Sequence, residues 1–393
     1  MLSSLPRGGE DSQQELEGLA SKETQGPSSL PRGGEDSKQE LDGSRQEFLL
    51  ALKRYEKLHS DMLDGKRPGK YLTYVTNYSG WSDRVRGFFS VATVAFMTDR
   101  AFLFKNNMAD IDLAAVYAQD PIRWFAEPDA PLVHSFSVGY MRLEEELLRE
   151  DTIERMRNEL GNIELTMSDW AWEDIAHHPL LAEDRARLKL DDVPDWASLL
   201  FDLLFPPSPT MKNVLRDYVD LVPSPRMAIH IRTGVAEGSP QFFGGSLEAY
   251  VGNHIDCFKS VVESEGLANV TVFLATDYEP AFDIARGLLR SMQGENFSIR
   301  VMNGSAMGNI GHLVLAHPEN VHLRAHAEWE ILRRAEWLFP TRSGYSLVPF
   351  GLHHFPSARA FTTNLNSAGA CEEISPFGLG WFFTMEHLGQ FPK

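Results

Sequence analysis

The chain has few cysteines and a shortage of positive charge for its length. Only two of its 393 residues are cysteine, Cys257 and Cys371. They can form one disulfide at most, so a disulfide-rich scaffold is excluded and the cellular compartment stays open. Lysine and arginine number 37 against 55 aspartates and glutamates, a formal net charge of -18. A nucleic-acid-binding protein normally carries a basic face, so this composition argues against that class but leaves room for a local anion pocket.

Long apolar runs are also missing. The longest candidate, residues 87–97, falls short of the roughly eighteen consecutive apolar residues that a membrane span needs. The amino terminus has no basic segment followed by an apolar run, which is the pattern of a secretory signal. The sequence as it stands therefore predicts a soluble chain without a membrane span.

The first 44 residues contain a duplicated segment. Residues 3–18 and 28–43 are near copies, rich in Gly, Ser, Glu and Gln and poor in large apolar side chains. Such a segment buries too little apolar surface to offset the entropy of ordering the chain. We therefore predict a disordered, acidic tail over residues 1–44.

The next part of the chain, residues 45–225, is predicted to be an amino-terminal α/β domain with a helical insertion. Apolar residues recur at helical spacing from Gln46 to about Leu63, and again through much of residues 140–215. Between these two stretches, the pattern predicts a strand over residues 71–76, an apolar helix and a strand over residues 101–104. These three elements would make one βαβ unit.

Residues 226–393 predict a second domain in which strands and helices alternate. Apolar segments of strand length occur at residues 228–231, 270–275, 298–302, 337–340 and 359–362, with helical patterns between them. This alternation predicts a parallel, doubly wound sheet. The chain thus reads as two Rossmann-like halves, and a cleft between them is the expected ligand site.

The most informative run is Met227-Ala-Ile-His-Ile-Arg-Thr-Gly234. A short apolar strand ends here in His230 and Arg232. In open α/β sheets, ligands bind outside the carboxyl ends of the strands. A fixed arginine at that edge favours an anion, most often a phosphate, because guanidinium offers a planar fork of donors. Taken alone, the run fits an ordinary strand whose arginine pairs with a neighbour equally well.

Two further polar groups follow strands of the same predicted sheet. The pair Thr276-Asp277 comes directly after the strand over residues 270–275, and the turn Thr341-Arg-Ser-Gly-Tyr-Ser346 follows the strand over residues 337–340. Small residues that open a helix expose backbone N–H groups, and the helix dipole adds positive potential. Arg232 facing this turn would complete a pyrophosphate clamp.

These residues resemble the motifs of the GDP-fucose-dependent fucosyltransferases, which include α1,6-, protein O- and plant cell-wall α1,2-fucosyltransferases. His-Ile-Arg at 230–232, Ala-Thr-Asp at 275–277 and the block from Glu328 to Ser346 are similar to three motifs of that superfamily. The turn from Gly80 to Gly87 and the later Thr-Asp-Arg-Ala-Phe resemble its amino-terminal Gly-rich motif and the strand after it. The resemblance covers roughly residues 71–104 and 226–363.

The resemblance implies a GT-B fold, with two Rossmann-like domains facing a cleft. It also implies inverting transfer of fucose from GDP-fucose to a glycan or protein hydroxyl, with no metal or other cofactor. Enzymes of this type usually work in the Golgi or endoplasmic reticulum, although no anchor is visible in this sequence. The resemblance places Arg232 on the β-phosphate of GDP, His230 against the nucleotide and Glu328 at the guanine edge. The other donor-site residues that it implies are Asp277, which would brace the arginine loop, Ser343, Gly344, Tyr345 and Ser346 as phosphate ligands, and Gly80 and Arg84 of the Gly-rich turn.

The sequence departs from the family pattern at two positions. Thr233 stands where a second basic residue often follows the His-x-Arg motif, and Tyr278 replaces the second aspartate of Ala-Thr-Asp-Asp. The nearest acid in the following loop is Glu237, which is the candidate general base toward an acceptor hydroxyl. The alternative for Glu237 is a solvated loop carboxylate, and the sequence does not identify the acceptor.

Two other functions stay open. One is a protein that binds a nucleotide sugar or a glycan without transferring it. The other is a metal-dependent hydrolase, because His322, His326 and Glu330 recur at a spacing that puts them on one face of a helix and suits a metal ion.

Overall fold

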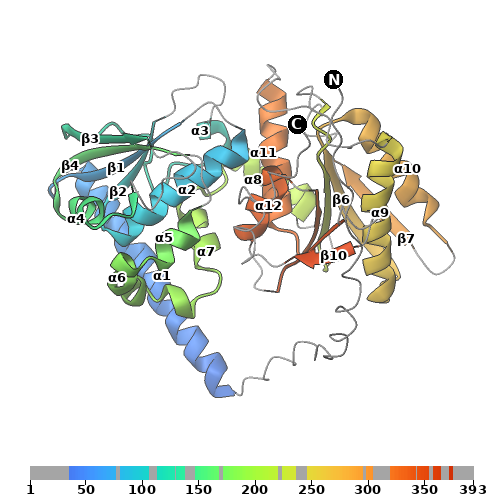
Figure 1. The fold of residues 1–393 in the computed structure, drawn as a ribbon, viewed down its shortest axis with the longest axis horizontal. Helices are drawn as coiled ribbons and strands as arrows, with labels where there is room; N and C mark the ends of the chain where they lie inside the picture. Colours follow the sequence, from blue (N-terminus) through green and yellow to red (C-terminus); the bar gives the residue numbers. More distant parts are fainter. Residues whose placement is uncertain are drawn as a thin grey trace, which may run out of the picture. The chain divides into compact units, whose positions relative to one another are not determined.

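Two β-sheets organise the part of the chain that the computed structural model describes (Figure 1). The described residues are 35–76, 80–105, 113–128, 130–137, 147–167, 171–219, 224–235, 246–294, 298–303, 319–341, 343–353, 357–363 and 371–374. The chain divides into two units, residues 1–42 and 43–393, and both sheets belong to the second. Within the described ranges, every helix is too short or too polar to serve as a bilayer span.

The first sheet is fully parallel, with the strand order β2-β1-β4-β3. Its strands are β1 (Lys70–Val75), β2 (Ala101–Lys105), β3 (Leu132–Ser137) and β4 (Gly161–Thr166). Helix α2 (Trp81–Met97) connects β1 to β2 and is buried along nearly its whole length. From Gly87 onward its sequence is almost wholly apolar, which is the pattern of a helix enclosed in a core. The predicted βαβ unit is confirmed.

Two expectations for this half are wrong in detail. The helical pattern over residues 140–215 extends across β4, yet helix α4 (Glu150–Asn158) ends before it. The cap residue Glu159 is already extended, and Gly161, where β4 begins, has a φ of 107°, a conformation that favours glycine. Strand β4 lies between β1 and β3 in the sheet. Its residues Ile163 and Leu165, two positions apart, are both buried. Helix α1 (Glu35–Leu63) also begins earlier than residue 46, so residues 35–44 are helical rather than part of a disordered tail.

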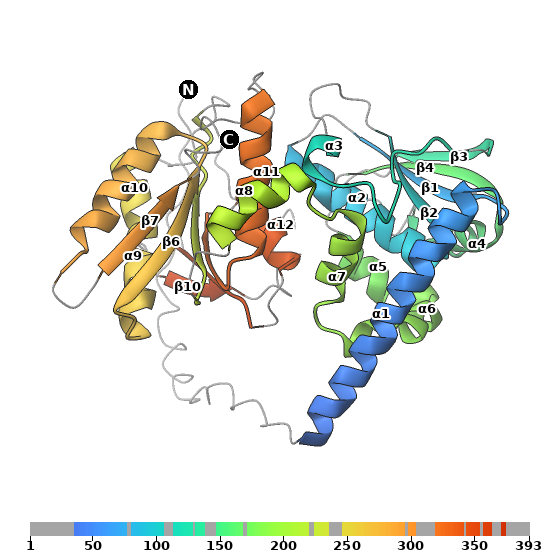
Figure 2. The same ribbon diagram turned by 180° about the vertical axis from the view of Figure 1, so that it is seen from behind.

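The remaining helices of this half are short. They are α3 (Leu113–Val116), α5 (Trp172–His177), α6 (Ala182–Leu188), α7 (Trp196–Leu204), α8 (Pro209–Val219) and the 3-10 helices Pro179–Leu181 and Leu190–Asp192. The views in Figures 1 and 2 agree that α8 lies against α11 (Glu319–Arg333). Helix α8 therefore packs on a helix of the second half, although it precedes the predicted domain boundary at residue 226.

The second sheet has the order β10-β9-β8-β5-β6-β7, and only β10 runs antiparallel to its neighbour. Its strands are β5 (Met227–Ile231), β6 (Asn269–Thr276), β7 (Ser298–Asn303), β8 (Trp337–Pro340), β9 (Arg359–Thr363) and β10 (Cys371–Ile374). The other helices of this half are α9 (Leu247–Ser264), α10 (Glu279–Ser291) and α12 (Gly344–Gly351). The five predicted strands are confirmed, and β10 was not predicted. Strands β6 and β7 follow on one side of β5, whereas β8 and β9 follow on its other side. The topological switch point, where the strand order reverses direction, therefore lies between β5 and β8.

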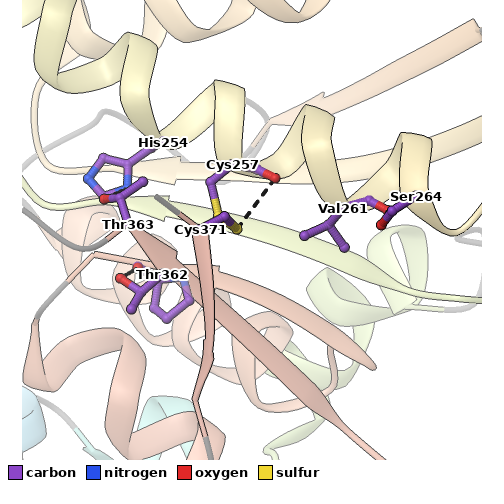
Figure 3. The surroundings of a disulfide bond; sticks show 8 residues. His254, Cys257, Val261, Ser264, Thr362, Thr363 and Cys371 are labelled. Carbon is purple, nitrogen blue, oxygen red and sulfur yellow. Dashed lines mark hydrogen bonds between the residues drawn. A yellow bond between two sulfur atoms is a disulfide. The ribbon is translucent and has the colours of Figure 1, made fainter. Parts of the chain in front are cut away.

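Helix α9 is linked covalently to the edge of this sheet. Cys257 of α9 and Cys371 of β10 form a disulfide with a Cα–Cα distance of 5.0 Å (Figure 3). One turn earlier on the same helix, Nδ1 of His254 lies 3.2 Å from the hydroxyl of Thr363 at the end of β9. Both contacts hold α9 against the same pair of strands.

The largest hydrophobic cluster is continuous between the two halves. It includes Trp81 and Phe88 of α2, Phe201 of α7, Trp329 of α11 and Leu347 of α12. The ring centroids of Phe201 and Trp329 are 5.4 Å apart. A second cluster fills the other face of the second sheet, beneath α9 and α10. Helices α2, α11 and α12 are therefore held together by shared packing, which fixes the polar residues at their amino ends.

Candidate active site

The carboxyl ends of β5 and β8 are tied together at the switch point. The backbone N–H of Thr341 donates to the carbonyl of His230 at 3.0 Å, and the N–H of Arg232 donates to the Thr341 hydroxyl at 2.9 Å. Hydrogen bonds of this length on both sides of Ile231 leave the end of β5 little freedom. Arg232 therefore leaves the sheet in a defined direction at the position where open α/β folds bind ligands.

The carboxylate of Asp277 accepts hydrogen bonds from three consecutive residues of the loop after β5. One carboxylate oxygen accepts from the guanidinium of Arg232 at 2.8 Å and from the backbone N–H of Gly234 at 3.0 Å. The other accepts from the N–H and the hydroxyl of Thr233, at 2.7 and 2.9 Å. Gly234 has a φ of 68°, a left-handed conformation that glycine adopts without strain. Because a buried carboxylate is costly unless its oxygens are satisfied, these bonds define one loop conformation.

Arg232 is also held through its own carbonyl. The hydroxyl of Tyr250, on α9, donates to that carbonyl at 2.9 Å. The Arg232 side chain remains 12 % exposed beside its 6 % exposed partner Asp277. The guanidinium is thus fixed but reaches the surface of the sheet edge, as an anion-binding arginine must.

The amino end of α12 lies beside the amino end of α2. Ser343 caps α12, and its hydroxyl accepts from the N–H of Tyr345 at 3.3 Å. A Cβ built on Gly344 would lie 3.7 Å from Cβ of Ser82 and 3.8 Å from a carboxylate oxygen of Asp83, both in the first turn of α2. Two helix amino ends converge here, and each adds positive potential and backbone N–H groups.

Ser346 belongs to the same turn but faces the strand end. Its hydroxyl donates to the carbonyl of Thr341 at 3.2 Å and is fully buried. The Tyr345 hydroxyl donates to the carbonyl of Ala325 on α11. The turn that was predicted to bind phosphate is therefore anchored to both β8 and α11.

His230 is buried and uncharged at neutral pH. Burial lowers its pKa to about 3, with Asp277 opposing the shift and Arg232 adding to it. Its ring lies 5.0 Å from the ring of Tyr345, centroid to centroid. Within the described residues, its Nδ1 has no hydrogen-bond partner. Because buried polar atoms are normally paired, this nitrogen marks a position that a ligand or a water molecule would satisfy.

Glu328 lies on α11 and is paired with an arginine that sequence reasoning overlooked. Its carboxylate accepts from Nε of Arg324 at 2.8 Å, and both side chains are almost completely buried. Burial raises the pKa of Glu328, and the Arg324 charge opposes that rise. Between them on the helix, the ring of His326 lies 4.2 Å from the ring of Trp81. This part of α11 therefore faces the first turn of α2.

The Gly-rich turn is only partly described. Gly80 precedes α2 and accepts a backbone hydrogen bond from Arg84 at 3.1 Å. Arg84 is 2 % exposed, and its charge counteracts the burial that raises the pKa of Tyr74 on β1. Glu237, the predicted general base, lies outside the described residues. The roles of Gly80, Arg84 and Glu237 stay predictions.

Glu330 belongs to an ion cluster in the core. Its carboxylate accepts from Arg333 at 3.2 Å and from Arg334 at 2.5 Å, while the Tyr117 hydroxyl lies 3.4 Å away. Two guanidinium groups therefore occupy Oε2 of Glu330, and the Tyr117 hydroxyl donates to Oε1. Within the described residues, which do not include the His322 side chain, no group of three potential ligands surrounds a metal position. The hydrolase alternative thus loses its carboxylate ligand.

Two residues of this site escaped sequence reasoning: Tyr250 and Arg324. Tyr250 acts through a single hydroxyl group on a helix whose pattern indicates only secondary structure. The signal for Arg324 was its position four residues before Glu328, a spacing that brings opposite charges together on a helix.

Comparison with known proteins places this geometry in a known fold. No family model matches the sequence, and a search of curated proteins finds no significant match. The structure is similar to that of an Arabidopsis thaliana FUT1 mutant in complex with GDP, with a TM-score of 0.57, 13% identity and coverage of 84% of this chain and 83% of that one.

Two other solved structures are more distant. Fucosyltransferase NodZ from Bradyrhizobium has a TM-score of 0.42 and 13% identity, covering 79% of this chain and 100% of that one. POFUT1 in complex with GDP-fucose has a TM-score of 0.40 and 12% identity, covering 75% and 98%. These two scores are too low to support a fold assignment, which rests here on the FUT1 structure and on the sheet topology. The predicted fold is confirmed: the chain has two Rossmann-like domains arranged in the GT-B fold of plant FUT1.

Proposed function

We propose that the chain is an inverting glycosyltransferase that moves fucose from GDP-fucose to a glycan or protein hydroxyl. The observation that carries this proposal is the fixed arginine at the switch point. Asp277 holds Arg232 and its loop through both carboxylate oxygens, beside the amino end of α12. The FUT1 structure with the same fold contains GDP.

The proposed chemistry concerns the bond between the fucosyl carbon and the diphosphate. That bond breaks as the acceptor oxygen attacks from the opposite face, the acceptor proton passes to a base, and GDP leaves. Negative charge builds up on the β-phosphate in the transition state, and fixed donors stabilise it there more than in the substrate. Arg232 and the backbone N–H of Gly344 are the proposed donors, since the N–H groups of Ser343, Tyr345 and Ser346 already donate within the turn. Glu237 is the proposed base. With these charges in place, we expect the reaction to need no metal.

Guanine recognition is assigned to Glu328. A carboxylate accepts two parallel hydrogen bonds from the N1–H and the amino group of guanine, a pattern that adenine does not offer. His230 is neutral and presents an unpartnered Nδ1 near the Tyr345 ring, which suits contact with the nucleotide. These two roles would make the site specific for GDP among nucleoside diphosphates.

The disulfide bears on the compartment. Cys257 and Cys371 are paired in the folded chain. Disulfides persist in oxidising compartments such as the lumen of the secretory pathway and are rare in the cytosol. We therefore propose that the protein acts in the lumen of the Golgi or endoplasmic reticulum, where glycan acceptors are available.

A nucleotide screen tests the donor assignment. A ligand that binds only the folded chain stabilises it by about 2.7 kcal/mol at a hundredfold excess over its Kd. GDP should therefore raise the melting temperature, while UDP, ADP and CMP at the same concentration should not. A selective response to UDP would redirect the assignment to another sugar donor.

A transfer assay with GDP-fucose then separates an enzyme from a binding protein. Turnover over a panel of glycan and glycoprotein acceptors, with chelator present, is the expected result. Tight GDP binding in calorimetry together with no transfer to any acceptor would favour the alternative of a non-catalytic nucleotide-sugar-binding protein.

A further inference from the structure

A groove lies where helices α1, α2 and α6 meet in the first half of the chain. Its volume is about 280 Å³. The floor consists of buried and half-buried apolar or aromatic side chains: Ala51, Tyr55, Leu58, Phe96 and Leu188. The rim carries four cations and one carboxylate: Arg54, Lys57, Arg67, Arg187 and Asp99. Figures 1 and 2 both show α1 beside α6.

The rim is positive in a chain that is strongly negative overall. The four cations come from three separate segments, which are α1, the turn before β1 and α6. Among the described lining residues, Asp99 is the one carboxylate. The chain as a whole has a formal net charge of -18. A net negative surface repels anions, so a local positive groove attracts them selectively.

The rim cations on the α1 side are only partly neutralised by their neighbours. Lys57 and Arg67 share one carboxylate, that of Asp61, at 2.7 and 3.8 Å. Within the described ranges, Arg54 has no carboxylate at ion-pair distance. The Lys57 side chain is 74 % exposed. Positive charge is therefore left over for a ligand on this side of the groove.

Arg187 gives the opposite side of the groove a fixed cation. Its guanidinium donates to the carbonyl of Met97, the last residue of α2, at 2.9 Å, and to the carboxylate of Asp184 at 3.2 Å. The carboxylate of Asp99 lies 3.6 Å from its other terminal nitrogen. The Arg187 side chain is nevertheless 44 % exposed. These contacts hold the charge in place while leaving it accessible from the groove.

The lining indicates what kind of anion the groove suits. A free phosphate or sulfate ion would contact the charged rim and leave the apolar floor in water. A sugar ring has apolar C–H faces that fit such a floor, and a sulfate or carboxylate at its edge would reach the rim. The aliphatic stems of lysine and arginine add further apolar surface for the ring. An anionic sugar therefore uses both parts of the lining, as small-molecule ligands do in mostly apolar pockets with a few polar groups.

The groove is separate from the candidate active site. It lies at the carboxyl end of α2, beside Phe96, whereas Ser82 at the amino end of the same helix faces α12. A helix of 17 residues is about 25 Å long. A sugar ring in the groove is therefore out of reach of Arg232, and the two sites can be tested independently.

We propose that the groove is a binding site for an anionic glycan, whose sulfate or carboxylate groups contact the four cations of the rim. The choice of a glycan rests on the proposed function, because a glycosyltransferase of the secretory pathway encounters glycans. The charge and the shape of the groove do not depend on that function. A second contact with the glycan keeps it attached to the chain and raises the local concentration of acceptor groups.

Calorimetry with three oligosaccharides of equal length tests the proposal. The probes are a sulfated heparin fragment, an oligogalacturonate, whose charges are all carboxylates, and an uncharged chito-oligosaccharide. The unaltered chain should bind at least one anionic probe and not the uncharged one. The affinity should fall as salt is added, because interactions of exposed charges are screened. Binding of the heparin fragment alone would assign the groove to sulfate groups, and binding of the oligogalacturonate would assign it to carboxylates.

The double variant Arg54→Glu and Lys57→Glu should lower the affinity for the anionic probe about tenfold or more, as loss of charge-assisted hydrogen bonds requires. Both side chains are exposed, so we expect the variant to fold. The matched control, Lys259→Glu and Arg286→Glu, makes the same change in net charge on α9 and α10 and should leave the affinity unchanged. The affinity for GDP should be the same in both double variants.

Equal affinities for the anionic probe in the groove variant and its control, or no binding of either anionic probe to the unaltered chain, would overturn the proposal. Tighter binding of an oligoglutamate than of either anionic glycan would also overturn it and would favour an acidic polypeptide. Failure of the unaltered chain to bind GDP would instead overturn the proposed function, while the glycan affinities would still test the groove. The two failures are therefore distinguishable.

Discussion

Two arginines at opposite edges of the two sheets have different surroundings. Arg100 directly precedes β2, at the amino edge of the first sheet, and Arg232 directly follows β5, at the carboxyl edge of the second. Arg100 is fully buried and donates only to backbone carbonyls, those of Tyr71, Arg155, Met156, Glu159 and Gly161. Arg232 is paired with the carboxylate of Asp277 and remains partly exposed.

The partners explain what each arginine does. Three of the carbonyls that Arg100 binds belong to the last residues of α4 and its cap, where the helix dipole is negative. Arg100 therefore joins α4 to β1 and β4, and it supports the fold. Arg232 is held by a carboxylate that also positions its loop, at the edge where ligands bind. Both arginines lie in motifs that resemble one enzyme family, so the motifs alone do not separate their roles. The sheet edge on which each arginine lies and its partner, backbone carbonyls or a carboxylate, do separate the structural role from the functional one.

Replacing Arg100 should have a large effect on stability. Arg100→Ala would leave several buried carbonyls without a donor, and each charge-assisted hydrogen bond contributes about 1.5–3 kcal/mol. We expect a loss of about 4 kcal/mol or more, measured by denaturant unfolding. Arg100→Lys, which restores one cationic donor, should recover part of it. A loss below about 1 kcal/mol would contradict the structural role of Arg100.

The disulfide tests how the carboxyl edge is supported. Cys257 and Cys371 are separated by 114 residues, and the loop-entropy model assigns about 5 kcal/mol to closing a loop of this size. The double variant Cys257→Ser and Cys371→Ser should unfold at correspondingly lower denaturant, yet bind GDP with nearly unchanged affinity while folded. Loss of GDP binding from the folded variant would mean that the covalent link, rather than packing, positions α9 and Tyr250.

Replacing Arg232 should have the opposite balance of effects from replacing Arg100: a large loss of activity and a small loss of stability. Arg232→Ala should reduce fucosyl transfer about 100- to 1000-fold, the effect of removing one donor to a developing charge. Its unfolding free energy should fall by only about 1–2 kcal/mol, because Asp277 keeps its bonds to Thr233 and Gly234. An undiminished transfer rate would show that Arg232 has no role in transfer, and its contrast with Arg100 would then not be one of function against structure.

A separate effect, on the pH dependence of stability, concerns the buried histidines at the two edges. Burial lowers the pKa of His254, beside β9, and of His59, beside β2, to about 4. Below pH 6.5 the unfolded chain takes up protons at these positions that the folded chain does not bind. Stability should therefore be complete above pH 6.5 and fall toward pH 4, by about 1.4 kcal/mol per pH unit for each histidine.

His254→Gln and His59→Gln should each reduce that slope in denaturant unfolding followed between pH 6.5 and 4. His177→Gln, at a largely exposed side chain, is the control. Equal slopes in all three variants and the unaltered chain would show that neither buried histidine contributes.

Much of the fold could be predicted because its strands and helices have strong local patterns. The strand ending at Ile231 and the apolar helix α2 are regular in sequence and in structure. Strand β4 was missed because Met156, Leu160 and Ile163 keep helical spacing across a glycine whose positive φ only the folded chain specifies. A local sequence pattern cannot show that the helix ends here, because the strand that follows is stabilised by hydrogen bonds to β1 and β3, which are distant in the sequence.

The sequence by itself determined which residues end the strands, and hence that His230, Arg232 and Asp277 lie at one edge of a parallel sheet. Tertiary structure decided what each of them contacts. The pairing of Arg232 with Asp277 requires β5 and β6 to be neighbours. The hydrogen bond from Tyr345 to the carbonyl of Ala325 requires α11 to pack beside α12. Likewise, two cysteines in the sequence permit one disulfide, but only the packing of α9 on β10 brings them together. Strand order and helix packing depend on contacts between distant segments, which no local pattern encodes.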